Sequence, residues 1–355
     1  MKNTIYLILL SLCIVSCTED KPSSSCETVD NNAILQNLGN IIVDRYSQLN
    51  TQATLTQTAI TAFITAPTTV TLTAAQNALK QLYLDFETVE MLQFGPAESY
   101  LQRTALNNYP TDTTIIQTAI ANGITDLQNI SNSAKGIHAL DYLLFGVANS
   151  NTDIVNWYSA TNNKNYLTAV MTQVKTVINN VYNEWNPNDG NYYNTFINAT
   201  GVDIASAFGQ LSNAIIADYE KYARDGKVGI PLGIRTLGVP QLNNVEGLYS
   251  KTSLQLLENY IINYKSLFNG NNGLGLDDYL NNVGRSDLST QINNELQAIL
   301  NTIDTFNHDL AYEITNNEAA VQTLYSQLQA LLLTLKVDMV SAMCLTITYQ
   351  DVDGD

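Results

Sequence analysis

Apolar side chains recur every three or four positions along most of the chain, which is the spacing of one face of an α-helix. The pattern is clearest in residues 34–46, 79–89, 167–185, 208–222, 256–264, 292–306 and 321–335. Strand-like alternation is nearly absent, and 344–349 (CLTITY) is the one plausible strand. The sequence therefore predicts an all-α protein with at most one short C-terminal strand.

Residues that interrupt helices divide this pattern into blocks. They fall at 66–67, 109–110, 186–190, 226–240 and 269–275. We interpret 186–194 as a linker between two helical bundles packed side by side, residues 30–185 and 195–355, the second ending in a short extended tail. Each block is long enough for its own core. No repeat of 20–50 residues occurs, which argues against a solenoid.

The first residues have the features of a secretory signal. Lys2 precedes an apolar stretch, residues 5–15, that is too short to cross a membrane. Ile-Val-Ser-Cys at 14–17 resembles the lipobox of bacterial lipoproteins, whose cysteine is acylated; a simple signal peptide ending near a chance cysteine is the alternative. We expect residues 1–16 to be removed, Cys17 to carry a lipid, and 17–29 to form a flexible tether.

Two more cysteines remain near opposite ends of the mature chain, Cys26 and Cys344. In an exported protein they could form a disulfide, although the sequence leaves open whether they meet. The expected location is the outer membrane, facing the periplasm or the cell surface, with the membrane as a partner through Cys17.

Charge and histidine content narrow the possible functions. The 355 residues include 33 acidic and 16 basic side chains, for a formal net charge of −17. Nucleic acid is therefore not an expected partner, because no basic stripe is present to displace phosphate counterions. Only two histidines occur, which excludes a His-rich metal cage.

The segment GIHALDYLLFG (136–146) is the densest group of unusual residues. On a helix, His138 and Asp141 share a face, so an imidazole nitrogen and a carboxylate oxygen can converge on one cation. Gly136 removes side-chain bulk one turn earlier, which would let another backbone or a ligand approach. The structural alternative is a histidine satisfied by the nearby aspartate in a polar pocket.

Two glutamates fall on apolar faces. Glu90 continues the buried stripe of 79–89, and Glu246 shares an expected helical face with Ser253. A buried carboxylate needs a cation, hydrogen-bond donors or a proton. A salt bridge, for example to Arg235, is one solution, but the chain has few positive charges, so a metal is a natural alternative.

These observations define a pool of candidate metal ligands. It consists of Glu90, His138, Asp141 and Glu246. One histidine among carboxylates suits iron better than a zinc hydrolase site, and zinc or no metal are the alternatives. Other motifs do not support a specific site. The HExxH motif of zinc peptidases is absent, and residues 351–355 (DVDGD) lack the closing Glu of a calcium loop. We interpret residues 229–233 as a rigid loop.

Several segments together resemble the imelysin-like family, which is catalogued as peptidase M75. GIHALDYLLFG resembles its GxHxxE segment, with Asp141 where the family has Glu. The other matching segments are Glu90 followed four residues later by Phe-Gly-Pro, NYPTD at 108–112, VEGLYSKTS at 245–253, NGLGL at 272–276, and the closing TYQDVDGD.

This resemblance implies a two-domain helical fold with the GxHxxE site near the domain interface, export to the periplasm or outer membrane, and a link to iron acquisition. The expected function is a lipid-anchored protein that binds iron and works with iron-uptake or envelope partner proteins. A metallopeptidase is one alternative, although Asp141 is one methylene shorter than the motif Glu. A metal-free surface module that binds glycan or protein is the other.

Overall fold

The computed structural model describes residues 31–349, and every regular element in that range is helical. The all-α prediction is confirmed. The long helices are α1 (Asn32–Thr65), α2 (Thr69–Glu90), α8 (Thr161–Trp185), α10 (Ala207–Asp218), α12 (Ser253–Phe268), α14 (Ser286–Ile303) and α16 (Glu318–Leu333). Each of the seven periodic segments lies in one of these helices or in its direct continuation.

Shorter helices connect the long ones. They are α3 (Pro96–Ser99), α4 (Gln102–Leu106), α5 (Thr113–Ala121), α6 (Gly136–Asp141), α7 (Asn151–Trp157), α9 (Tyr192–Asn198), α11 (Ile230–Leu232), α13 (Leu276–Asn282), α15 (Leu310–Asn316) and α17 (Val340–Ala342). Three π-helices are η2 (Tyr142–Gly146), η3 (Tyr219–Gly229) and η6 (Thr334–Met339), and three 3-10 turns are η1 (Asn132–Ala134), η4 (Leu242–Asn244) and η5 (Gly270–Asn272).

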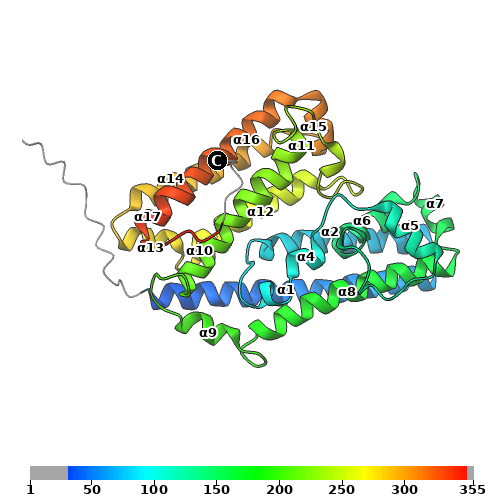
Figure 1. Ribbon diagram of the computed structural model, residues 1–355, viewed down its shortest axis with the longest axis horizontal. Coiled ribbons are helices and arrows are strands. Elements are labelled where there is room, and N and C mark those ends of the chain that lie inside the picture. Colours follow the sequence, from blue (N-terminus) through cyan, green and yellow to red (C-terminus); the bar gives the residue numbers. More distant parts are fainter. Residues whose placement is uncertain (1–30, 350–355) are drawn as a thin grey trace, which may run out of the picture.

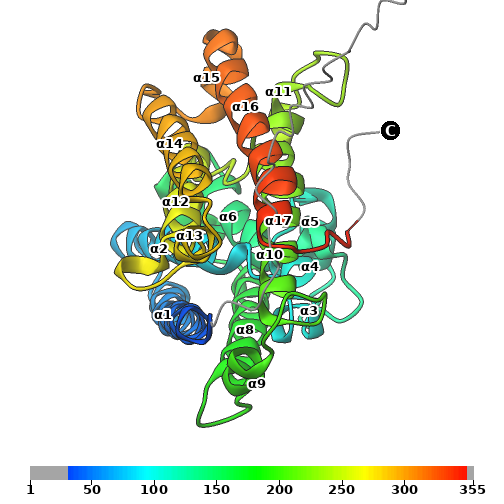
Figure 2. The same ribbon diagram turned by 90° about the vertical axis from the view of Figure 1, so that its left-hand side faces the viewer.

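The helices form two neighbouring groups that meet along α2 and α12. In Figure 1, α1, α2 and α8 run side by side in the lower half, while α14 and α16 lie above them. Helix α12 contacts α2 on one side and α14 on the other, and η3 contacts both α12 and α16. Figure 2 shows α12, α14 and α16 stacked above α1. Helix α9, beyond the predicted linker, packs on α1 and α8, and the division at 186–194 stays a prediction.

Helix α2 carries the carboxylates of the site on its buried face. Thr68 caps its N-terminus in a capping box with Thr71, which satisfies free N–H groups of the first turn. Its core residues include Leu79, Leu82, Tyr83 and Phe86, and the same face continues with two acidic residues, Glu87 and Glu90. The apolar spacing that builds the helix therefore also directs both carboxylates into the protein.

Residues 344–349 form no strand, which agrees with the prediction of at most one; the Asn213 side chain bonds the backbone of this segment at Thr346 and Thr348. One local prediction is wrong. Residues 226–232 form no break or loop, because η3 and α11 run through them. The glycines there allow close packing: a Cβ at Gly229 would lie 2.8 Å from the Tyr325 ring. The chain leaves the helix at Gly233.

Several predictions concern the chain termini. In the part of the chain described here, none of the helices combines the length and the apolar character that crossing a membrane requires. Cys344 is disulfide-bonded, whereas Cys17, Cys26 and the acidic segment 351–355 lie outside the described residues. The lipid at Cys17 and the pairing of Cys26 with Cys344 therefore stay predictions.

Candidate metal site

Three glutamates from two distant parts of the chain meet in the interior. Glu87 and Glu90 come from α2, and Glu246 comes from a turn that follows η4. One carboxylate oxygen from each lies within 4.8 Å of the others, and all three residues are at most 1% exposed. Oxygen ligands at this separation can surround a single metal ion. We call Glu87, Glu90 and Glu246 the triad.

Lys227 reaches the triad from η3. Its Nζ lies 2.9 Å from Glu87 Oε2 and 3.0 Å from Glu90 Oε2, and it donates a short hydrogen bond to Glu246. Its side chain is 2% exposed. Lys227 thus places one positive charge among three carboxylates.

Arg103 of α4 approaches Glu90 from another direction. Its Nη1 donates to Glu90 Oε1 over 2.8 Å, and its Nη2 also pairs with Asp218 at the end of α10. Tyr260 donates to the same aspartate. Arg103 is therefore shared between two acids. The expectation that positive charges are too few to reach these glutamates is wrong, and the predicted partner Arg235 instead pairs with Asp225.

Protonation differs sharply within the triad. Burial and the neighbouring carboxylates raise the pKa of Glu87 well above its usual value, and burial also raises the pKa of Glu246. Burial opposes ionisation of Glu90 too, but Lys227 and Arg103 outweigh it and lower its pKa. Oε2 of Glu87 and Oε2 of Glu90 share the Lys227 ammonium, and neither accepts a well-directed hydrogen bond. A proton on Glu87 would relieve the repulsion between the carboxylates, and so would a second cation.

His138 lies beside the triad. Its Nε2 is 3.8 Å from Glu246 Oε1 and is hydrogen-bonded to Asn107, whose Nδ2 donates to Glu90 Oε1 over 2.6 Å. Because Asn107 therefore turns its Oδ1 toward the ring, Nε2 carries the proton and Nδ1 accepts from Tyr83, 2.9 Å away. Burial and Lys227 lower the pKa of His138 to about 3. The imidazole is neutral, which is the form that binds metals.

Asp141 does not point at the same place as His138. Its two oxygens accept the backbone N–H groups of Tyr249 and Ser250, at 3.0 and 3.1 Å. Burial raises the pKa of Asp141 to about 6, although these hydrogen bonds oppose the shift. The aspartate thus ties α6 to the turn that carries Glu246, and it positions that residue.

The supporting residues predicted around the site are spread over the molecule. Gly136 has φ +80°, and a Cβ there would lie 2.5 Å from the Leu106 carbonyl, so the glycine admits the backbone of α4. Ser253 Oγ accepts from Leu310 N, away from the triad. Glu246 does not share a helix with Ser253, because α12 begins only at Ser253 and Gly247, at φ +58°, turns the chain before it.

Sequence reasoning missed Glu87, Lys227 and Arg103. Glu87 had a signal, since it lies four residues after Tyr83 and three before Glu90 on the same buried face. No sequence pattern pointed to Lys227, because it lies in a glycine-containing segment whose sequence predicts a break between helices. None pointed to Arg103 either, since α4 is too short to show periodicity.

Two cavities reach this cluster from different sides. One of about 310 Å³ is lined by Tyr109, Pro110, His138, Asp141, Val245 and Tyr249. The other, of about 390 Å³, is lined by Arg103, Asp218 and Tyr222 among others, with the Arg103 guanidinium 3.6 Å from the Tyr222 ring centre. The cavities thus border His138 and Arg103, the neighbours of the triad, while the triad carboxylates line neither of them.

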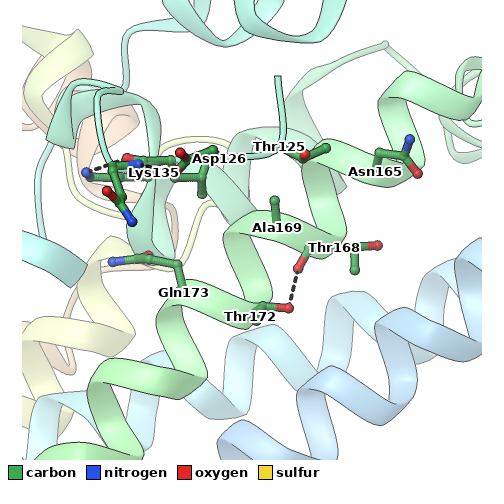
Figure 3. A pocket seen from close by; sticks show the side chains of 10 residues that line it. Thr125, Asp126, Lys135, Asn165, Thr168, Ala169, Thr172 and Gln173 are labelled. Carbon is green, nitrogen blue, oxygen red and sulfur yellow. Dashed lines mark hydrogen bonds between the residues drawn. The ribbon is translucent and has the colours of Figure 1, made fainter. Parts of the chain in front are cut away.

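A larger cavity of about 560 Å³ lies elsewhere, along α8 (Figure 3). Its charged side chains are already bonded to backbone groups: Lys135 donates to Leu127 O, and Asp126 accepts from Gln128 N. Thr172 likewise bonds back to Thr168 O within the helix. No titratable groups converge there, so the triad is the stronger candidate.

Comparison with known proteins gives a consistent result. The model of the imelysin family, Peptidase_M75, matches residues 42–335. The chain is 30% identical over 117 residues to "Iron-regulated protein A" of Synechococcus elongatus, a match that spans 33% of this chain and only 32% of that protein.

Two crystal structures share the fold. A candidate iron-regulated protein A precursor from Parabacteroides distasonis has a TM-score of 0.74 at 17% identity, covering 89% of this chain and 96% of its own. An imelysin-like protein from Psychrobacter arcticum has a TM-score of 0.72 at 16% identity, covering 92% and 98%. These identities support the fold and nothing finer.

Proposed function

The chain belongs to the imelysin family, and we propose that it binds an iron ion through Glu87, Glu90 and Glu246, with His138 as a fourth ligand. The observation that carries this proposal is the convergence of three buried carboxylates within 4.8 Å. Burying acids in excess over bases is unfavourable unless protons or a cation neutralise them. A metal ion would provide a cation for Oε2 of Glu87 and Oε2 of Glu90, which contact the Lys227 ammonium without a well-directed hydrogen bond.

The donor set favours iron over zinc. Carboxylate oxygens with a single imidazole suit a harder cation, whereas structural and hydrolytic zinc sites use more histidine or cysteine. The name of the Synechococcus relative, which records regulation by iron, supports the same choice.

His138 can join the triad by a shift of one proton within its ring. When Nε2 binds a metal, the proton resides on Nδ1, and Tyr83 Oη, 2.9 Å away, then accepts it as a hydrogen bond. A hydrogen-bond partner on the far nitrogen is the usual way in which metal-bound histidines are oriented. Asp141 contributes indirectly, by holding the turn of Glu246.

We further propose that the protein acts in the cell envelope. The lipobox-like segment ending at Cys17 supports a lipid anchor on an exported chain, and the tether 17–29 would separate the helical part from the membrane. A metal-holding module at that place would deliver its ion to envelope proteins of iron uptake.

Elemental analysis tests the metal proposal. The mature chain from residue 17, with Cys17→Ser to prevent acylation, is dialysed against low micromolar iron, zinc and calcium together. Near-stoichiometric iron is expected in the wild type. It should be absent from Glu90→Gln/Glu246→Gln and unchanged in Glu184→Gln, which alters a surface carboxylate on α8. A wild type free of metal would overturn the proposal.

Two further measurements separate the alternatives. Cleavage of a peptide library that stops with chelator would indicate a metallopeptidase. Binding of a glycan or a partner protein that persists unchanged in chelator, by a protein that holds no metal, would indicate a metal-free surface module.

A further inference from the structure

We propose that Lys227 is a built-in competitor for the metal: its ammonium group fills the space among the triad carboxylates, and an arriving metal ion displaces it. This inference rests on the proposed function. It follows from where Nζ lies, within 3.0 Å of Glu87 and Glu90 and in a short hydrogen bond to Glu246.

The ammonium and a metal ion need the same space. Nζ contacts an oxygen of every member of the triad, so it lies at the point on which the three carboxylates converge. A metal ligated by the same oxygens would lie only a few ångströms from it. Two cations at that separation in a buried site repel each other strongly. The metal-bound state therefore requires Lys227 to leave.

The surroundings offer the displaced side chain another place. The ring of Tyr260, on α12, has its centre 5.8 Å from Nζ, and an aromatic face stabilises an ammonium group by cation–π attraction. The hydroxyl of Tyr260 donates to Asp218, which pairs with Arg103. The face of the Tyr260 ring is therefore the place next to the triad that can receive the ammonium group.

Without metal, the same lysine keeps the site folded. Removing it leaves the three carboxylates with only the shared Arg103 as a nearby cation of the observed ion pairs. Lys227 is therefore the counter-ion of the carboxylates without metal, and it is the group that a metal ion must displace in order to bind. This double role would let the protein hold its metal reversibly, since each binding event has to break three ammonium–carboxylate contacts.

Titration with Fe²⁺ alone under anaerobic conditions tests this role. Lys227→Met, close in length and without charge, is expected to bind Fe²⁺ about tenfold or more tightly than the wild type, because a repelling like charge is gone. Lys227→Arg keeps the charge and should bind no more tightly. Lys265→Met is the matched control, since Lys265 bonds Gln297 at the surface; it should bind like the wild type.

Stability provides a second readout in case Lys227→Met folds poorly. Added Fe²⁺ should then restore its unfolding midpoint, because the metal replaces the missing ammonium. Lys227→Gln, which keeps one donor to the carboxylates, should show the same recovery. Variants that stay unfolded at saturating Fe²⁺ would overturn the competitor role.

The remaining outcomes separate this inference from the proposed function. If the wild type binds Fe²⁺ and the Lys227→Met and Lys227→Gln proteins bind equally or more weakly, the competitor role is wrong and the metal site stands. If no protein in the series binds metal, both proposals fail.

Discussion

Two buried ionic clusters lie on the same π-helix, η3, and they are built in opposite ways. On one side Lys227 meets three carboxylates, those of Glu87, Glu90 and Glu246. On the other, a single carboxylate, Asp225, receives two guanidinium groups, from Arg224 at 3.1 Å and Arg235 at 2.6 Å. The first cluster gathers three carboxylates around one ammonium group, whereas the second gathers two guanidinium groups around one carboxylate.

The two clusters differ in how many of their carboxylate oxygens accept hydrogen bonds. In the triad, Oε2 of Glu87 and Oε2 of Glu90 share the Lys227 ammonium, at 2.9 and 3.0 Å, and neither accepts a well-directed hydrogen bond. Both oxygens of Asp225 are bonded, and Tyr325 adds a third donor at 3.4 Å. Arg224 also reaches Gln329, over 2.6 Å. A cluster closed in this way stabilises the fold, whereas three carboxylates that share one ammonium group can exchange it for another cation.

The largest expected effect separates the clusters by stability. Asp225→Asn removes the carboxylate that Arg224 and Arg235 share, and Asp225 is only 5% exposed, so we expect a loss of about 3–5 kcal/mol in the free energy of unfolding. Urea denaturation measures this loss, and elemental analysis should find the metal content unchanged. Loss of metal at full stability would mean that the two clusters are one functional unit.

A second effect concerns Asp141, which holds the turn of Glu246, and it depends on pH. Because its pKa is raised from 3.8 to about 6, the folded state binds this proton more tightly than the unfolded state. Its contribution to stability is therefore greatest at low pH and is lost as pH rises from about 4 to 6.

Asp141→Asn removes this dependence. The stability difference between wild type and variant should shift by about 2 kcal/mol toward the variant between pH 4 and pH 7. Denaturation curves at pH 4, 5, 6 and 7 measure it, with the surface variant Asp153→Asn as a control. A difference that stays constant with pH would contradict the raised pKa.

The smallest expected effect on stability is in the triad itself. Burial and the neighbouring carboxylates raise the pKa of Glu87 and so favour its neutral form, which glutamine imitates. Glu87→Gln should therefore change the free energy of unfolding by less than about 1 kcal/mol at neutral pH. Iron affinity should nevertheless fall about tenfold or more. A loss of stability comparable to that of Asp225→Asn would show that the triad is structural too.

The sequence determined the fold class because helices are specified locally. Residues three and four positions apart decide which face of a helix is apolar, and that information lies within each segment. The same spacing placed Glu90 on the buried face of α2, as its complete burial confirms. It failed at Gly226–Leu232, where glycines that read as a break instead allow a π-helix to pack closely.

Only the tertiary structure decided what surrounds those carboxylates. The cluster combines α2, α4, η3 and the turn of Glu246, and it joins segments as far apart as Glu87 and Lys227, which are 140 positions apart. It also decided that Asp141 faces the turn at Tyr249 while His138 faces Glu246. Periodicity specifies which face of each helix is buried, whereas the partner of a buried charge depends on how the helices pack, and no local pattern encodes that.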